Sequence, residues 1–79
     1  MPIHVLLSPL IRKYIPDYEH STGIRLTVDA PHSVEQIIAR LSIPREEVIS
    51  IMVNGYPAKY NSTVNDGDSV TLAKVIGGG

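Results

Sequence analysis

Apolar residues alternate with more polar ones in several short segments of the chain. This period-two pattern is typical of half-buried strands, and it predicts strands at residues 3–8, 24–29, 49–53 and 69–73. The apolar members of these segments are Ile3, Val5, Leu7, Ile24, Leu26, Val28, Ile49, Ile51, Val53, Val70 and Leu72. Asn54-Gly55 is a strong hairpin-turn signal. It predicts a short return strand at 56–60, which Pro57 would confine to a sheet edge.

One segment has the three- and four-residue spacing of an amphipathic helix. Val34, Ile37, Ile38 and Leu41 form an apolar stripe, and Ser33 with Gln36 has the form of a capping box. A short helical turn is predicted after Pro9 and would end before Pro16. A second short helical segment is predicted from Pro44 through residue 47.

The order of these elements predicts an α+β fold. Strand, strand, helix, strand, short strand and strand is the β-grasp order, with a mixed sheet of four to five strands packed on one main helix. Residues 1–79 are expected to form a single domain. The core-facing alternation of the last strand stops at Lys74, so the chain is expected to leave the sheet there, with 75–79 as a flexible C-terminal tail.

Composition narrows the classes of function. The 79 residues carry a net charge of −1, which gives no electrostatic reason to expect nucleic acid or an anionic membrane as partner. There is no cysteine, which excludes disulfides, thiolate metal sites and cysteine nucleophiles. The sequence has neither a signal peptide pattern nor an apolar run of membrane-spanning length, so a soluble cytoplasmic protein is expected.

The histidines give no sign of a metal site or of catalysis. His4, His20 and His32 lie far apart without metal-ligand spacing, and no serine, histidine and acid trio is apparent. Asp66-Gly67-Asp68 lacks the further acidic positions of a calcium loop and is predicted to be a turn. We therefore expect no metal, no cofactor and no catalytic residues, and a protein that is not itself an enzyme.

The last residues, Lys74 to Gly79, end in three glycines. A free α-carboxylate is a group that no interior residue has. If a partner adenylates it, the tail must pass extended through a narrow channel, where a Cβ atom would clash. Gly78 and Gly79 meet that requirement because glycine lacks side-chain bulk and tolerates backbone angles closed to other residues.

Two stretches of the chain resemble a known family. The ending from Asp66 to Leu72, followed after a spacer by Gly78-Gly79, resembles the MoaD/ThiS sulfur carriers, which are ubiquitin-like β-grasp proteins. The middle, from Ile43-Pro44 to Val53-Asn54-Gly55, is also similar, so the resemblance covers nearly the whole chain. Tails of that family often have proline, proline, valine and alanine before the glycines, where this chain has residues 74–77.

The resemblance implies a function and a set of partners. Gly79 would be adenylated and converted to a thiocarboxylate that donates sulfur in biosynthesis, with Gly78 as its slim neighbour and Gly77 a less essential part of the tail. The partners would be a ubiquitin-activating-type enzyme that binds ATP, a sulfur donor such as a cysteine desulfurase, and an acceptor synthase subunit. A molybdopterin-type cofactor is the favoured product, while thiazole, cysteine and transfer RNA thiolation stay open.

The sequence leaves two other functions open. A ubiquitin-like modifier would join Gly79 to lysines of other proteins through the same adenylate, and a β-grasp binding module would have an inert tail. Partner docking is expected on the sheet face opposite the helix, because alternation leaves apolar side chains there. These are Leu6, Met52, Ala73 and Val75.

Overall fold

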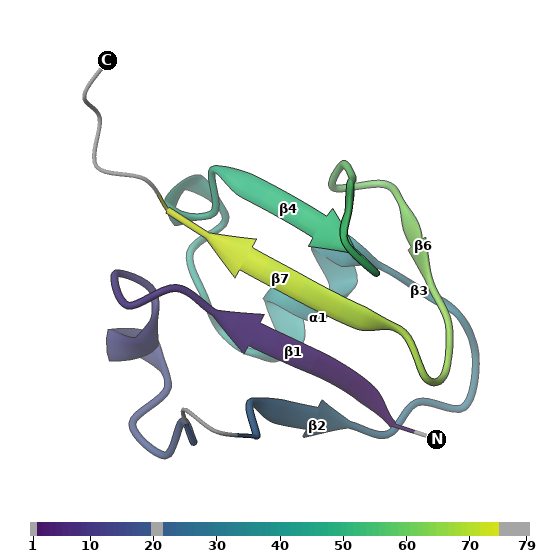
Figure 1. The fold of residues 1–79 in the computed structure, drawn as a ribbon, viewed down its shortest axis with the longest axis horizontal. Coiled ribbons are helices and arrows are strands. Elements are labelled where there is room, and N and C mark those ends of the chain that lie inside the picture. The colour runs from purple at the N-terminus through teal and green to yellow at the C-terminus, as the bar shows by residue number, and fades with distance from the viewer. Residues whose placement is uncertain (1, 20–21, 75–79) are drawn as a thin grey trace.

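The structure is a computed structural model that describes residues 2–19 and 22–74. In this part of the chain, five strands form one mixed sheet in the order β2-β1-β7-β4-β5 (Figure 1). β7 lies at the centre, parallel to β1 on one side and antiparallel to β4 on the other. The strands are β1 (Ile3–Leu7), β2 (Ile24–Leu26), β4 (Ser50–Val53), β5 (Tyr56–Pro57) and β7 (Ser69–Ala73).

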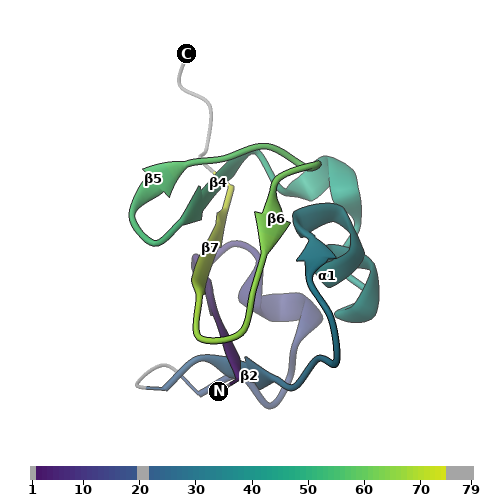
Figure 2. The ribbon, with the colours of Figure 1, turned by 90° about the vertical axis from the view of Figure 1, so that its right-hand side faces the viewer.

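Helix α1 (Val34–Arg40) covers one face of this sheet and leaves the other face open (Figures 1 and 2). The predicted capping box is present at its start. The Ser33 hydroxyl accepts the Gln36 backbone N–H at 3.1 Å, and the Gln36 side-chain oxygen accepts the Ser33 N–H at 2.8 Å. Such a cap stabilises a helix by about 1 kcal/mol, which matters for a helix of only seven residues.

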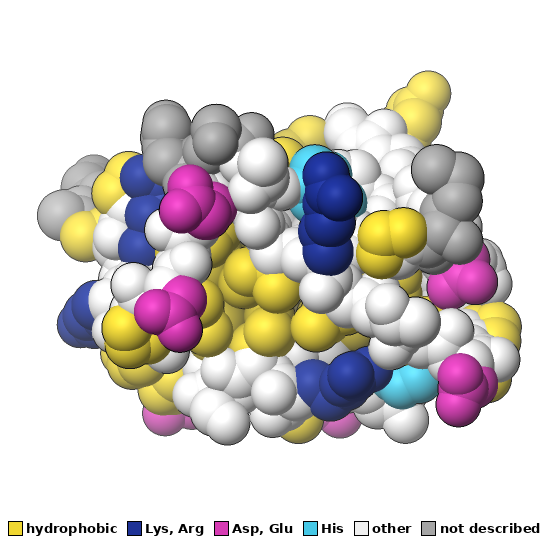
Figure 3. Space-filling view, turned by 90° about the horizontal axis from the view of Figure 1, so that it is seen from below, with side chains coloured by type: hydrophobic (Ala, Val, Ile, Leu, Met, Phe, Trp, Pro, Cys, Tyr) yellow, Lys and Arg dark blue, Asp and Glu magenta, His cyan; other side chains and the backbone are white. Residues whose placement is uncertain are grey.

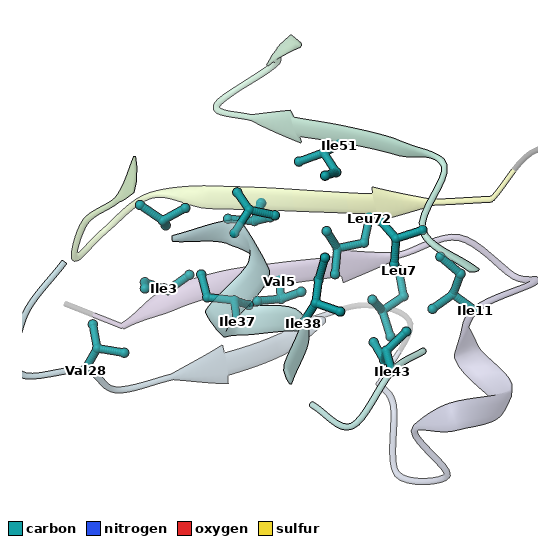
Figure 4. Close-up of a cluster of buried hydrophobic side chains, with 14 residues drawn as sticks. Ile3, Val5, Leu7, Ile11, Val28, Ile37, Ile38, Ile43, Ile51 and Leu72 are labelled. Carbon is teal, nitrogen blue, oxygen red and sulfur yellow. The ribbon is translucent and has the colours of Figure 1, made fainter. Parts of the chain in front are cut away.

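The hydrophobic core lies between α1 and the sheet. Figure 4 shows Ile37 and Ile38 of the helix in one cluster with Val5 of β1 and Leu72 of β7. Four further buried residues were not assigned to the core by the strand and helix patterns, because they lie in connections and short elements: Ile11, Ile43, Val48 and Val64. The core therefore extends beyond the regular elements into the loops that close its ends.

The predicted β-grasp fold is confirmed, including the mixed sheet, the main helix and the edge position of β5 with its proline. The short helical segments are 3₁₀ turns, η1 (Arg12–Tyr14) and η2 (Arg45–Glu47). Five details differ from prediction. β1 ends at Leu7 and β5 at Pro57, before the predicted ends at residues 8 and 60. β4 begins at Ser50, leaving Ile49 63% exposed, and β2 ends at Leu26. A second sheet pairs β3 (His32–Ser33) with β6 (Thr63–Val64) beside α1 (Figure 2).

The edge of the molecule along β2 is only partly covered. Ile24 and Leu26 are half-buried and pack against the core from this strand. Viewed from this side, hydrophobic side chains gather in the middle of the surface with Lys and Arg side chains on either side (Figure 3). The sheet thus exposes some apolar surface at its β2 edge as well as on its open face.

Candidate functional site

The candidate site is the C-terminal tail together with the part of the domain from which it starts. Val75, Gly77, Gly78 and Gly79 lie outside the described residues, so the sequence predictions for them stay predictions. Lys74, the last residue before the tail, is described. β7 ends at Ala73 and Lys74 follows it outside the strand, so the strand ends where the sequence pattern predicted, and the course of residues 75–79 stays a prediction.

Hydrogen bonds hold the end of β7 from both sides. The Ser8 hydroxyl accepts the Lys74 backbone N–H at 3.1 Å, and the Ser8 N–H donates to the Leu72 carbonyl at 3.1 Å. From the β4 side, the Ile49 N–H donates to the Ala73 carbonyl at 2.9 Å. The backbone is therefore hydrogen-bonded to both neighbouring segments up to Lys74, the last residue before the tail.

An ion pair lies at the same end of β7. Lys74 Nζ donates to Glu47 Oε1 at 2.8 Å, and the Tyr14 hydroxyl donates to the same oxygen at 3.1 Å. The hydrogen bonds from Lys74 and then Tyr14 lower the pKa of the Glu47 carboxyl. The same bond to Glu47 raises the pKa of the Lys74 ammonium. Both shifts favour the charged forms, so the pair is ionised at neutral pH.

Three of the predicted docking residues lie on the open face of the sheet. Leu6 of β1 and Met52 of β4 each pair with Thr71 of the central strand, so the three side chains form one row across the sheet. Ala73 lies two residues further along β7, opposite Ser50. All are half-buried. The face is thus a mixture of apolar and small polar side chains that extends to the start of the tail.

The motifs that carry the family resemblance lie at the other end of β7 and bond to each other. The Asn54 amide donates to Asp68 Oδ1 at 3.0 Å, and the Asn65 backbone N–H donates to Asp68 Oδ2 at 2.9 Å. Asn54 also accepts the Ser69 N–H at 2.9 Å through its side-chain oxygen. Asn54 has a φ of 52°, a conformation that asparagine tolerates better than most residues. These hydrogen bonds join the Asn54-Gly55 turn to the turn formed by residues 65–68.

Acid is expected to weaken the hydrogen bonds that the Asp68 carboxylate accepts. Hydrogen bonds from the Asn65 backbone and then the Asn54 amide lower the pKa of the Asp68 carboxyl. A lowered folded-state pKa adds stability above the unfolded value of about 3.9, and that stability is lost as the pH falls through the folded value. Urea unfolding of the wild type and Asp68→Asn should therefore differ more at pH 7 than at about pH 2.5. A difference that does not change with pH would contradict this.

The described residues contain few other candidates for chemistry. Within residues 2–19 and 22–74, no group of three or more His, Asp or Glu side chains is close enough to hold a metal ion. No helix of this part of the chain is long and apolar enough to cross a membrane. Tyr18 accepts the Leu7 N–H at 3.1 Å through its hydroxyl and packs on the core, which explains this aromatic residue as part of the fold.

A helix on one face of a mixed sheet, with the first and last strands parallel and adjacent, defines a ubiquitin-like β-grasp protein. Comparison with known families agrees, since residues 1–75 match the family described as Mut7-C ubiquitin (Ub-Mut7C). The chain belongs to this family. It is a ubiquitin-like family and is consistent with the resemblance to MoaD/ThiS sulfur carriers. No curated protein matches the chain.

Sequence patterns identified only part of this site. Alternation within strands assigned Leu6, Met52 and Ala73 to the open face, but the position of Thr71 between two of them depends on strand pairing. Ser8 and Glu47 were not predicted to lie near the tail. They are 66 and 27 residues from Lys74 in the sequence, and no local pattern indicates such contacts.

Proposed function

We propose that this protein is a sulfur carrier whose working group is the carboxylate of Gly79. A partner of the ubiquitin-activating type would catalyse attack of this carboxylate on ATP, forming an acyl adenylate and releasing pyrophosphate. The persulfide of a donor such as a cysteine desulfurase would then displace AMP and form an acyl disulfide. A thiol of the donor or the partner would reduce its sulfur–sulfur bond, which releases the thiocarboxylate and leaves a disulfide. An acceptor synthase subunit would receive the sulfur, with a molybdopterin-type cofactor as the favoured product.

The observation that carries this proposal is the glycine sequence that follows the central strand of a ubiquitin-like fold. The chain leaves the central strand β7 at Ala73, and the Gly78-Gly79 sequence follows after a spacer of four residues, 74–77. A firmly held base with a side-chain-free end suits a carboxylate that must enter a partner's active site. Small ubiquitin-like domains are typically not catalytic themselves, which agrees with a role as the modified protein.

The open face of the sheet is the proposed docking surface for the adenylating partner. Leu6, Met52 and Ala73 are half-buried there, and Ala73 lies two residues before the tail. A partner bound to this face would have its active site within reach of the tail. Small polar side chains such as Thr71 and Ser50 between the apolar ones suit an interface that forms and separates repeatedly, because such interfaces are no more apolar than the rest of the surface.

The test is to incubate the chain with its cognate adenylating enzyme, ATP and a sulfur donor, and to measure its mass. The expected product has one oxygen replaced by sulfur. Methionine oxidation changes the mass by nearly the same amount, so the position of the change must be determined. Trypsin cleavage after Lys74 releases residues 75–79, which contain no methionine. Because the chain has no cysteine, sulfur in this peptide indicates the thiocarboxylate.

Several outcomes would contradict the sulfur-carrier proposal. An unchanged 75–79 peptide in the presence of an active partner would do so, as would a native protein whose intact mass shows that Gly79 is not its free C-terminus. Thiol-resistant conjugates of higher mass in cell extracts would instead favour the ubiquitin-like modifier. Unchanged function after removal of Gly78 and Gly79 would favour a binding module with an inert tail.

A further inference from the structure

Two segments near the N-terminus and one from the middle of the chain meet at Lys74. Ser8 follows β1, Tyr14 belongs to η1, and Glu47 ends η2. Ser8 binds the Lys74 backbone, while Glu47 binds its ammonium group and is itself bound by the Tyr14 hydroxyl. We call Ser8, Tyr14, Glu47 and Lys74 the stem clamp. It holds both the main chain and the side chain of the last residue before the tail.

The ion pair of the stem clamp is less exposed to solvent than the other ion pair of the described residues. The Lys74 and Glu47 side chains are 34% and 21% exposed. Arg45 and Glu35 form a pair of the same 2.8 Å length, but their side chains are 59% and 52% exposed. Partial burial reduces screening by water and salt, and the hydroxyl of Tyr14 further restrains the Glu47 carboxylate. Glu47 is therefore better placed than Glu35 to hold its basic partner, Lys74, in one geometry.

We propose that Glu47 is a positioning residue, which through Lys74 sets the place and direction from which residues 75–79 start towards the active site of an adenylating partner. This inference rests on the proposed function. The physical reason is entropic. A tail that starts from an ordered residue searches a smaller volume with its terminal carboxylate than one that starts from a loose residue, so less freedom is lost when the partner binds it.

The test measures ATP–pyrophosphate exchange by the adenylating partner as a function of carrier concentration. Glu47→Gln is expected to raise KM roughly two- to tenfold, the effect of having to order one further long side chain on binding. The kcat at saturating carrier is expected to stay near that of the wild type, because the bound tail reaches the same position. The melting temperature of each variant, measured by circular dichroism, shows whether it is folded.

Variants of Lys74 separate the clamp from a direct contact between Lys74 and the partner. Lys74→Gln is expected to raise KM as Glu47→Gln does, and Lys74→Arg is expected to retain the ion pair and a KM near that of the wild type. The double variant Glu47→Gln/Lys74→Gln should be no worse than either single variant, because both remove one interaction. Independent, multiplicative effects would overturn the proposal.

Glu35→Gln is the matched control. It removes an ion pair of equal length whose residues, Glu35 and Arg45, lie outside the stem clamp, and its KM should not change. A second measurement needs no partner: in nuclear magnetic resonance, hydrogen exchange of the Lys74 amide should be faster in Glu47→Gln than in the wild type and unchanged in Glu35→Gln.

The outcomes distinguish failure of the clamp from failure of the proposed function. If the wild type supports exchange and Glu47→Gln has the same or a lower KM, the clamp is overturned and the sulfur-carrier proposal stands. An unchanged Lys74 amide in Glu47→Gln also overturns the clamp. If the wild type supports no ATP–pyrophosphate exchange with an active partner, both proposals fail.

Discussion

Removal of Gly79 is expected to abolish thiocarboxylate formation, and Gly78→Val is expected to lower kcat/KM for adenylation by about a hundredfold or more. The deletion moves the carboxylate one residue back from the reacting phosphate. Valine adds a branched side chain where the proposed channel admits only backbone, and it restricts the backbone angles at that position. ATP–pyrophosphate exchange and the mass of the C-terminal tryptic peptide, residues 75–79 in Gly78→Val and 75–78 in the deletion variant, measure the two effects.

Gly77→Ala is the matched control for these variants. It adds one methyl group two residues before the end, at a position where related tails carry a side chain, and a loss of less than about tenfold is expected, the lower end of what a misplaced methyl group costs in a binding site. None of the three changes should alter the melting temperature, because the described core contains no residue beyond Leu72. Equal activity of Gly78→Val and the wild type would contradict a narrow channel.

Replacing Leu72 with alanine is expected to lower the free energy of unfolding by about 2–5 kcal/mol. Leu72 is fully buried on the central strand, where it pairs with Leu7 of β1 and Ile51 of β4. The substitution leaves a cavity between two strands and the helix. Since a domain of this size is stabilised by roughly 4–12 kcal/mol in total, the loss would be a large share. Urea unfolding followed by circular dichroism measures it.

Ile49→Ala is the matched control for Leu72→Ala. It removes a side chain of the same size that is 63% exposed, so a change near 0.5 kcal/mol or less is expected. The comparison separates the effect of burial on the free energy of unfolding from the effect of removing a hydrophobic side chain as such. If the two variants had equal urea midpoints, the assignment of Leu72 to the centre of the core would be wrong.

Much of the fold could be predicted because its signals are local. Alternation identified β1 and β7, and the stripe of Val34, Ile37 and Ile38 with the Ser33 cap identified α1. These patterns depend on the geometry of a single element. The element order then limited the topology, because one amphipathic helix needs one sheet face to cover.

The errors and omissions involve contacts between elements. Strands β3 and β6 have two residues each, too few for any period, and they exist because the chain segments before α1 and after β5 happen to lie together. Ile49 continues the alternation of β4 but lies before its first paired residue. Its backbone N–H still donates to Ala73 of β7, but its side chain is 63% exposed and adds nothing to the core.

The candidate site was likewise predictable only where its signal is local in the sequence. The glycines of the tail are recognisable from the sequence, and the role proposed for them depends on the carboxylate of Gly79. The stem clamp is not, because it joins positions 8, 14, 47 and 74. A lysine after a strand and a glutamate in a helical turn are ordinary surface residues until the fold brings them within 2.8 Å.

The central place of β7 has a consequence for how the protein matures. The sheet lacks its central strand until residues 69–73 can pair with both β1 and β4, so a nascent chain cannot complete its core before these residues have left the ribosome. Pairing between segments so distant in sequence also makes folding slow for a domain of this length. An incomplete or misfolded molecule would then lack an ordered base for its tail, and an activating partner would meet a correctly presented substrate only on chains that have finished folding.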